Sequence, residues 1–557
     1  MNIKPLDGVL SISEQINAAD IDAIKSVGYR SIICNRPDGE APDQPRGVDI
    51  AAASSAAGLA FRHIPVVASS ITDAQIAEFQ KALSEMPGPI LAYCRSGSRS
   101  ATLWALSHAH ETSAVELIAR ASSAGVDIAA VAPRLRERQT ANGAGAPIWD
   151  VVIVGGGAAG IATAASLLRR RPSLKICVVE PAEKHYYQPG WTMVGAGVFT
   201  AAETCHSMAS VMPAEVTWRK AAVVAFDPER NEVALSSGER ERYRMLVVAC
   251  GLTLDWSAIP GLSEALGKNG VTSNYRFDLA PYTWELVQKL QKGVALFTQA
   301  PMPIKCAGAP QKAMYLSADY WRSQGRLGDI AIHFHTAAPV LFGVKEFVPP
   351  LMEYVNRYGA TLHTESRLVR VDGAARTAVF REKRADGTEA DVSRQFDFLH
   401  VCPAQVSPEF VRTSALAAPS GWVDVDDATM QHKRFKNVFA LGDVASTPNA
   451  KTAAAARKQA PIVATNLLAV LDGAAPTAAY DGYGSCPLTV ERGKIVLAEF
   501  GYGGKLLPTF PKWLIDGQKP SSLAWMLKTK ILPQVYWQGM LKGREWMCKP
   551  QEKSALH

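Results

Sequence analysis

The chain has 557 residues, of which 48% are hydrophobic and 20% charged, so it is long enough for about three domains and too apolar to be disordered. It contains no uncharged apolar run of about 18 residues and no basic-then-apolar leader, which argues against a spanning helix and a secretory signal. Nine scattered cysteines with no C-x-x-C pair predict a reducing compartment and individual reactive thiols, not a disulfide scaffold or a zinc site.

The first 139 residues carry the pattern of one small α/β domain. Short apolar runs that end at Gly, Pro or Asp alternate with runs of helical period. A stretch of small residues at 140–147 predicts a flexible linker to the rest of the chain. The predicted elements are strands at Ser31–Cys34, Ile64–Val67 and Ile90–Tyr93, and helices at Thr72–Met86 and Ala101–His110.

A cysteine site is predicted where the third of these strands ends. Cys94 is followed by a glycine-containing loop and a helix, a cradle whose backbone N–H groups stabilise a thiolate. Four residues separate Cys94 from Arg99, whereas phosphatases of this kind need five, and Ser100 stands where their arginine would be. The loop resembles that of rhodanese-type sulfurtransferases, whose cysteine carries a persulfide. The domain resembles the phosphatase-like domain fused to bacterial persulfide-processing hydrolases. The alternative is an ordinary buried cysteine.

A nucleotide-binding turn opens the next region. Residues 151–160 form an apolar strand that runs into G-x-G-x-x-G, with glycines at Gly155, Gly157 and Gly160. Such glycines allow a tight turn and close approach to a pyrophosphate, and the following helix N-terminus binds the anion. Glu180 ends the next apolar run and is placed to bind a ribose hydroxyl. We expect residues 148–500 to form a doubly wound α/β flavoprotein with two Rossmann-like subdomains.

The second half of that region lacks the glycine turn that a nicotinamide site needs. A predicted strand at Gly293–Phe297 runs into Pro301–Lys312, which has a thiol, Cys306, in place of a second G-x-G-x-x-G. Electrons are therefore expected to enter from sulfur, not from NAD(P)H. Lys305 and Lys312 would lower the pKa of the Cys306 thiol.

Longer motifs resemble the sulfide:quinone oxidoreductases, in particular the type that includes the mitochondrial enzymes. The resemblance covers residues 150 to about 548 and implies FAD as cofactor, sulfide or a low-molecular-weight persulfide as electron donor, quinone as acceptor, and a thiol such as glutathione as sulfur acceptor. The segments that carry it are His185–Thr192, Lys305–Lys312, Phe342–Lys345, Gly421–Asp426, Lys451–Ala455 and Tyr480–Pro487. The residues expected at FAD are Gly155, Gly157, Ala158, Ala159, Gly160, Glu180, Gln188, Gly251, Gly442, Asp443 and Lys451.

The chain departs from this family at one redox position. The resemblance makes Cys306 the first redox cysteine and implies a second directly after Asp443, where this chain has Val444. Cys402 is the best substitute by sequence, whereas Cys486 is expected to be structural. Two alternatives stay open: an NAD(P)H-dependent persulfide or disulfide reductase, and a non-catalytic redox or sulfur-carrier protein.

The last part of the chain, residues 501–557, is basic and rich in tryptophan. From Lys505 on it has nine basic and three acidic residues, most of the net charge of +7. Basic residues interleaved with apolar anchors suit a peripheral position on an anionic membrane, by analogy the cytoplasmic face of a bacterial inner membrane. The equal alternative is a helix pair packed on its own protein. No nucleic-acid motif and no metal spacing among the eleven histidines is present, and a homo-oligomer is left open.

Overall fold

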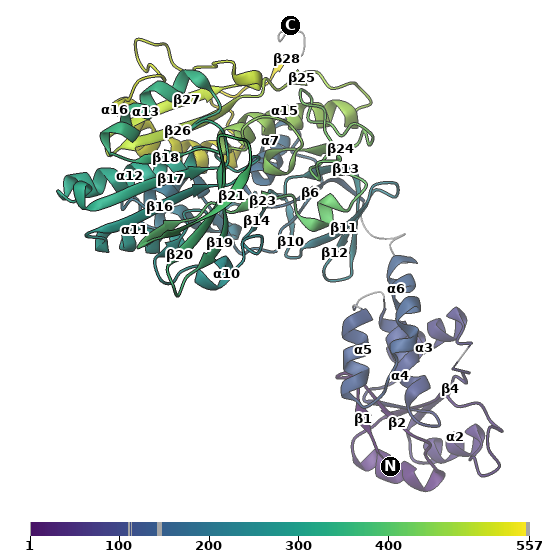
Figure 1. The fold of residues 1–557 in the computed structure, drawn as a ribbon. Coiled ribbons are helices and arrows are strands. Elements are labelled where there is room, and N and C mark those ends of the chain that lie inside the picture. Colours follow the sequence, from purple (N-terminus) through teal and green to yellow (C-terminus); the bar gives the residue numbers. More distant parts are fainter. Residues whose placement is uncertain (1, 69, 110–111, 113, 142–147, 553–557) are drawn as a thin grey trace. The chain divides into compact units, whose positions relative to one another are not determined.

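The computed structural model describes residues 2–68, 70–109, 112, 114–141 and 148–552 (Figure 1). The chain divides into two compact units, the first made of residues 1–147 with Ala234–Arg240 and the second of Ile148–Val233 with Glu241–His557. Most of the predicted linker, residues 142–147, lies outside the described residues.

A five-stranded sheet forms the centre of the first unit, in the order β1-β2-β5-β3-β4. All neighbours are parallel except β1 and β2. Alternate side chains of its inner strands face opposite layers: Ile33 packs under α3–α6, and Ile32 under α1 and α2. The strands are β1 (Lys4–Pro5), β2 (Leu10–Ser13), β3 (Ser31–Cys34), β4 (Ala60–His63) and β5 (Ile90–Tyr93). The helices are α1 (Ile21–Ser26), α2 (Gly47–Ala56), α3 (Asp73–Glu85), α4 (Ser98–His108), α5 (Ala114–Ser123) and α6 (Ala132–Ala141).

Most predicted elements of this unit are present. The strands β3 and β5 have the predicted bounds, and α3 begins after Thr72, whose side chain accepts a hydrogen bond from Gln75 N. The predicted strand at 64–67 is wrong, because β4 ends at His63. Ile64 N and Val66 N still donate to Cys34 O and Asn35 O, at 2.8 and 3.2 Å, but Pro65 between them has no N–H, and the regular strand ends before it.

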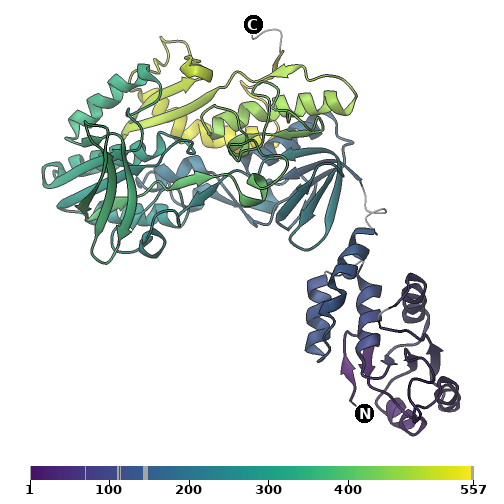
Figure 2. The ribbon, with the colours of Figure 1, turned by 45° about the vertical axis from the view of Figure 1, so that its right-hand side comes forward.

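The second unit begins with a sheet in the order β10-β7-β6-β13-β12-β11, to which β24 adds beside β13. Its centre is parallel, and α7 packs against α15 beside it (Figures 1 and 2). The strands are β6 (Ile148–Val154), β7 (Ile176–Val179), β10 (Thr217–Arg219), β11 (Val223–Asp227), β12 (Glu232–Leu235), β13 (Arg240–Val248) and β24 (Val438–Ala440); the helices are α7 (Ala158–Arg170) and α15 (Ala453–Leu471).

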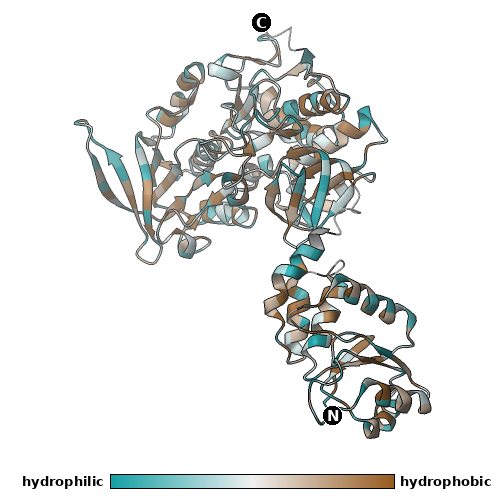
Figure 3. Cartoon of the chain, turned by 90° about the vertical axis from the view of Figure 1, so that its right-hand side faces the viewer, coloured by the Kyte–Doolittle hydropathy of each residue, from teal (hydrophilic) through white to brown (hydrophobic). Residues whose placement is uncertain are grey.

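A second parallel sheet follows, in the order β15-β22-β16-β17-β18. Helices α11, α12 and α13 share its apolar core with the antiparallel pair β26 and β27. The antiparallel sheet β19-β20-β21 carries hydrophilic and hydrophobic residues side by side (Figure 3). The bounds are β15 (Val271–Thr272), β16 (Gly293–Gln299), β17 (Ile330–Thr336), β18 (Thr361–His363), β19 (Ser366–Asp372), β20 (Thr377–Lys383), β21 (Glu389–Gln395), β22 (Phe398–His400), β26 (Gly484–Glu491), β27 (Lys494–Phe500), α11 (Leu279–Lys289), α12 (Ala309–Ser323) and α13 (Val348–Arg357). The unit is thus a Rossmann-like α/β fold built around two sheets with parallel centres, as predicted.

The tail segment, residues 501–552, is part of the second unit. Within it, residues 522–539 form a nearly continuous helix. The α-helical turns α16 (Ser522–Met526) and α17 (Leu532–Gln534) alternate there with wider π-helical turns at Leu527–Ile531 and Val535–Gly539. Its last strand, β28 (Gln551–Glu552), pairs with β25 (Ala478–Ala479).

Among the described residues, no helix combines the length and the apolar character needed to cross a membrane.

Candidate functional site

One cavity of about 650 Å³ dominates the second unit. Its walls come from the glycine turn after β6, the ends of β7 and β13, the loop before α12, and the tail segment. Of the predicted site residues it is lined by Gly155, Gly157, Ala158, Ala159, Glu180, Gln188, Gly251, Lys305, Cys306, Gly442 and Asp443. Gly160, Cys402 and Lys451 are not among its lining residues.

The glycine turn is built for close approach. A Cβ at Gly160 would lie 1.9 Å from the Gly155 carbonyl oxygen, and one at Gly155 would lie 2.7 Å from that of Ala249. Neither position can therefore carry a side chain without moving backbone. A Cβ at Gly157 would have nothing within 4 Å, so the turn leaves open space in front of the N-terminus of α7. This is the geometry that binds a pyrophosphate.

Acidic side chains occupy two of the strand ends. Glu180 accepts hydrogen bonds from Gly156 N and Ala182 N, both at 2.8 Å, which fix its carboxylate beside the turn. Asp443 follows Gly442, which has φ +73°, and burial raises the pKa of its carboxyl despite nearby Lys305 and Lys451. Both carboxyls lie where ribose and ribityl hydroxyls of a dinucleotide would need acceptors.

The residues present fit FAD. Besides the glycine turn and the two acids, three cavity-lining side chains have buried polar atoms without a partner among the described residues: Trp191 Nε1, Thr192 Oγ1 and both amide atoms of Asn274. Buried polar atoms are normally hydrogen-bonded. Orphaned atoms facing a cavity of this size are therefore consistent with a ligand that carries several hydrogen-bonding groups.

Cys306 lines the same cavity, in the loop between β16 and α12, and lies close enough to Asp443 for their charges to interact. It has a left-handed backbone, φ +50°, and its N–H donates to Lys451 O at 2.8 Å. Lys312 Nζ donates to its sulfur at 3.3 Å, and Cys486 Sγ lies 3.4 Å away. The hydrogen bond from Cys486 and the positive charges of Lys312 and Lys528 hold the pKa of Cys306 well below its usual range. These contacts therefore favour the thiolate form of Cys306.

Two of the lysines make contacts that the sequence did not predict. Lys305 donates to Gln188 Oε1 instead of contacting the Cys306 sulfur. Lys451 is buried and donates to the carbonyl oxygens of Asp443, at 2.7 Å, and Ala445, at 2.9 Å, so it holds the loop on both sides of Val444. Lys451 thereby positions Asp443 and is not solvated.

Cys402 is placed less favourably than the sequence suggested. Its sulfur is buried and lies 3.9 Å from Gln405 Nε2. Among the described residues, no hydrogen bond joins it to Cys306. Burial raises the pKa of the Cys402 thiol to about 11. It is thus a protonated core thiol, and the residue that sequence reasoning missed at this site is Cys486, which it had assigned a structural role.

The tail segment contributes another residue that sequence reasoning missed. Lys528 is buried in the cavity wall, donates to Pro189 O at 2.8 Å, and has its pKa lowered to about 7 by burial and by Lys312. The Tyr536 hydroxyl shares a hydrogen bond of 2.7 Å with His185 Nε2. The inner face of the tail is therefore part of the site, which no local pattern in a basic, tryptophan-rich stretch could reveal.

In the first unit, Cys94 lies where predicted, between β5 and α4. Gly97, with φ +89°, turns its N–H onto Cys94 Sγ at 3.1 Å. Arg99 donates twice to Glu40, both at 2.7 Å, and once to Val66 O at 2.9 Å. The hydrogen bond from Arg99 helps to lower the pKa of Glu40 to about 2. The loop thus has a thiolate cradle whose arginine is already paired with a carboxylate.

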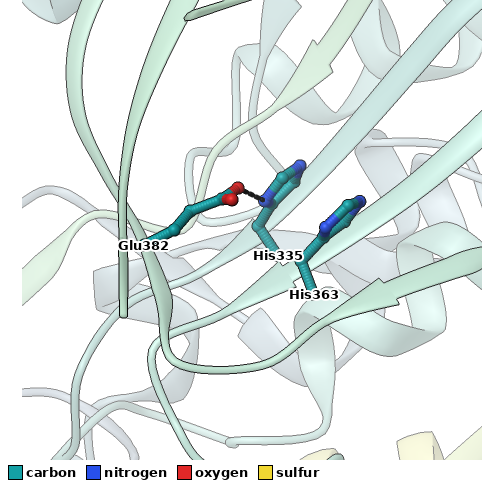
Figure 4. Close-up of side chains that lie close together, drawn as sticks. All are labelled: His335, His363 and Glu382. Atoms are coloured by element: carbon teal, nitrogen blue, oxygen red, sulfur yellow. Dashed lines mark ion pairs between the residues drawn. The ribbon is translucent and has the colours of Figure 1, made fainter. Parts of the chain in front are cut away.

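A histidine cluster lies outside the cavity, where β17, β18 and β20 meet (Figure 4). Glu382 pairs with Arg394 at 2.7 Å, and the rings of His335 and His363 stack 4.2 Å apart at 4°. An imidazole nitrogen binds a metal in the plane of its ring, so parallel stacked rings cannot both direct a lone pair at one ion. Burial lowers the pKa of His335 to about 2 and that of His363 to about 4. We assign no ion to this cluster of neutral rings.

Comparisons with known proteins cover both units. Residues 2–111 match the family described as the phosphatase-like domain of beta-lactamase hydrolase-like protein, and residues 149–290 match pyridine nucleotide-disulphide oxidoreductase. The chain is 40% identical over 405 residues to the mitochondrial sulfide:quinone oxidoreductase of Dictyostelium discoideum, covering 72% of this chain and 88% of that protein.

Two further relatives complete this picture. The first unit is 44% identical over 107 residues to a beta-lactamase hydrolase-like protein of Xylella fastidiosa, which is 19% of this chain and a quarter of that protein. The sulfide:quinone oxidoreductase structure from Aquifex aeolicus has the same fold as the second unit, with a TM-score of 0.59 and 20% identity over 71% of this chain and 92% of that one.

Proposed function

Because the chain belongs to the sulfide:quinone oxidoreductase family, we propose that its second unit oxidises sulfide, or a low-molecular-weight persulfide, and delivers the electrons to a quinone. The single observation that carries this proposal is the Cys306 thiolate, stabilised by Lys312 at 3.3 Å, in the wall of a cavity with a dinucleotide-binding turn. A thiolate is the form of cysteine that exchanges sulfur.

FAD is the cofactor of this enzyme, and bound FAD supplies the two-electron acceptor that the sulfur chemistry needs. The glycine turn and α7 would hold its pyrophosphate, and Glu180 and Asp443 its hydroxyls. Lys305 and Gln188, hydrogen-bonded to each other, line the same cavity. Lys312 keeps Cys306 deprotonated, so that its sulfur can attack or be attacked without a separate base.

The alternative of an NAD(P)H-dependent reductase has less support. After β16 the chain continues through Pro301 and Pro303 to Cys306, and α12 begins at Ala309 without a G-x-G-x-x-G turn. A nicotinamide dinucleotide would have no glycine turn at which its pyrophosphate could approach the backbone.

The first unit is proposed to relay sulfane sulfur. Cys94 in its N–H cradle would accept the outer sulfur from the second unit, directly or through glutathione or another small thiol, and the chain joining the two units raises the local concentration of the acceptor. The Arg99–Glu40 pair leaves less positive charge for a phosphate dianion, which favours a persulfide over a phosphate ester. A Cys94→Ser variant with unchanged release of sulfur product would rule this relay out.

The outer face of the tail segment is proposed to rest on a membrane surface, from which a quinone would reach the cavity. Trp513 is 84% exposed, and the exposed apolar residues of the same segment outside the cavity wall include Leu514, Leu523 and Met526. Exposed Lys512, Lys519 and Lys530 lie among them. Tryptophan with interleaved lysine is the composition of a peripheral, anionic-lipid-binding surface.

The proposed function is tested by anaerobic stopped-flow absorbance of the purified flavoprotein, mixed first with sulfide and then with a short-chain quinone. We expect rapid bleaching of the flavin by sulfide, recovery with quinone, and loss of bleaching in Cys306→Ser. The matched control is Cys402→Ser, a buried thiol outside the cavity, which should bleach like the wild type. Bleaching by NADH and not by sulfide would favour the reductase alternative.

A further inference from the structure

Cys486 lies where a second sulfur-carrying residue is needed. It is on β26, with 2% of its surface exposed, and its sulfur faces the loop that carries Cys306. A Cβ at Gly308 would lie 2.6 Å from the Cys486 sulfur, so a glycine is required there for the loop to come this close. The position that carries the second cysteine in the family motif holds the fully buried Val444.

The distance between the two sulfurs matches the distance between the outer sulfurs of a bent trisulfide. Cys306 Sγ and Cys486 Sγ are 3.4 Å apart. In a bridge through one extra sulfur, two S–S bonds of about 2.05 Å meet at an angle of roughly 107°, which places the outer sulfurs about 3.3 Å apart. A direct disulfide would need the sulfurs to approach by more than 1 Å from their separation of 3.4 Å, whereas a one-sulfur bridge needs almost no movement.

Positive charge surrounds the pair. Lys312 lies against both sulfurs, and Lys528 is buried beside them. Thiolates and persulfide anions are both stabilised by such cations. Access is unequal: Cys306 lines the cavity, whereas Cys486 lies behind it and only its neighbours Ser485 and Pro487 line the wall.

We propose that Cys306 and Cys486 together hold one sulfane sulfur as a trisulfide, with Cys486 replacing the cysteine that Val444 has displaced. This rests on the proposed function.

Hydrosulfide attacks the accessible Cys306 sulfur, which breaks its bond to the central sulfur and gives Cys306–S–SH and Cys486–S–S⁻. An acceptor thiolate RS⁻ removes the outer sulfur as RSSH and leaves the Cys306 thiolate. The Cys306 thiolate and the Cys486 persulfide then re-form the bridge and release two electrons, for which quinone is the final oxidant.

The test uses the full-length flavoprotein. After turnover with sulfide and a short-chain quinone, the wild type is alkylated, digested without reductant and mapped by mass spectrometry. We expect one cross-linked species joining the Cys306 and Cys486 peptides with the added mass of one sulfur, which dithiothreitol removes. In single turnover, Cys486→Ser should lower the rate of flavin bleaching by sulfide about 100-fold, whereas Cys402→Ser, equally buried, should change it less than about threefold.

Failure of this proposal is distinguishable from failure of the proposed function. A wild type that turns over sulfide and quinone, but whose Cys306 peptide is unbridged or joined to Cys402, would overturn the role of Cys486 alone. A wild type with no sulfide-dependent bleaching would instead overturn the proposed function. FAD content and the circular dichroism of each serine variant show whether it has folded, and the wild-type peptide map needs no variant at all.

Discussion

Replacing Lys312 by methionine keeps the length of the side chain and removes the positive charge beside Cys306. The ammonium lies 3.3 Å from the sulfur. Coulomb's law at that distance gives about 1.3 kcal/mol with the dielectric constant of water and about 5 kcal/mol with an effective constant of about 20. Since about 1.4 kcal/mol corresponds to one pKa unit, the pKa of Cys306 should rise by roughly 1 to 4 units in Lys312→Met.

The assay is the pH dependence of the rate at which iodoacetamide alkylates Cys306, followed by mass spectrometry on the reduced protein. The thiolate is the reactive form, so the inflection of the rate should move to higher pH and the rate at neutral pH should fall. Lys305→Met is the graded comparison: the Lys305 amine donates to Gln188 and acts on the Cys306 sulfur through charge alone, so its loss should move the inflection less than the loss of Lys312. An inflection in Lys312→Met that coincides with the wild type would show that the charge of Lys312 does not set the reactivity of Cys306.

Three further predictions follow from other parts of the molecule. Gly160→Ala should abolish FAD binding, measured by flavin absorbance of the purified protein, because its Cβ would lie 1.9 Å from the Gly155 carbonyl oxygen. Trp513→Ser should reduce co-sedimentation with anionic lipid vesicles several-fold, and equal sedimentation would refute a membrane role for the tail. His335, with its pKa lowered to about 2 by burial, stays neutral in the fold but takes up a proton on unfolding below its ordinary value of 6.5. The stability that the neutral, buried His335 ring gives is therefore complete above pH 6.5 and is lost as the pH falls below it. Phenylalanine takes up no proton, so His335→Phe should lose less thermal stability than the wild type between about pH 7 and about pH 5.

The sequence predicted the elements that local pattern controls. The bounds of β3 and β5, the cap of α3, the glycine turn and the Cys94 loop each depend on residues within a few positions of one another. The strand predicted at 64–67 failed because Pro65 has no N–H, so the buried residues Ile64 and Val66 make single hydrogen bonds to the end of β3 and no regular ladder.

The partner of Cys306 could not be found in this way. Cys486 is 180 positions away along the chain, on a strand whose alternating pattern is that of an ordinary core. Cys402 was favoured because it ends a strand beside the expected flavin, but burial raises the pKa of its thiol to about 11. Lys528 was similarly hidden in a stretch whose composition indicated a membrane surface, although one face of that helix turns into the protein.

That inward face has a consequence for the biogenesis of the enzyme. Every other wall of the cavity is synthesised before the tail segment, whose residues Leu527, Lys528, Ile531 and Tyr536 complete it. While the ribosome is still translating the tail, the glycine turn, Asp443 and the Cys306 loop can fold around an open cleft. The tail segment is therefore the last wall of the cavity to be made, and a chain truncated before Leu527 should leave the cavity open to solvent and release FAD faster than the full-length chain.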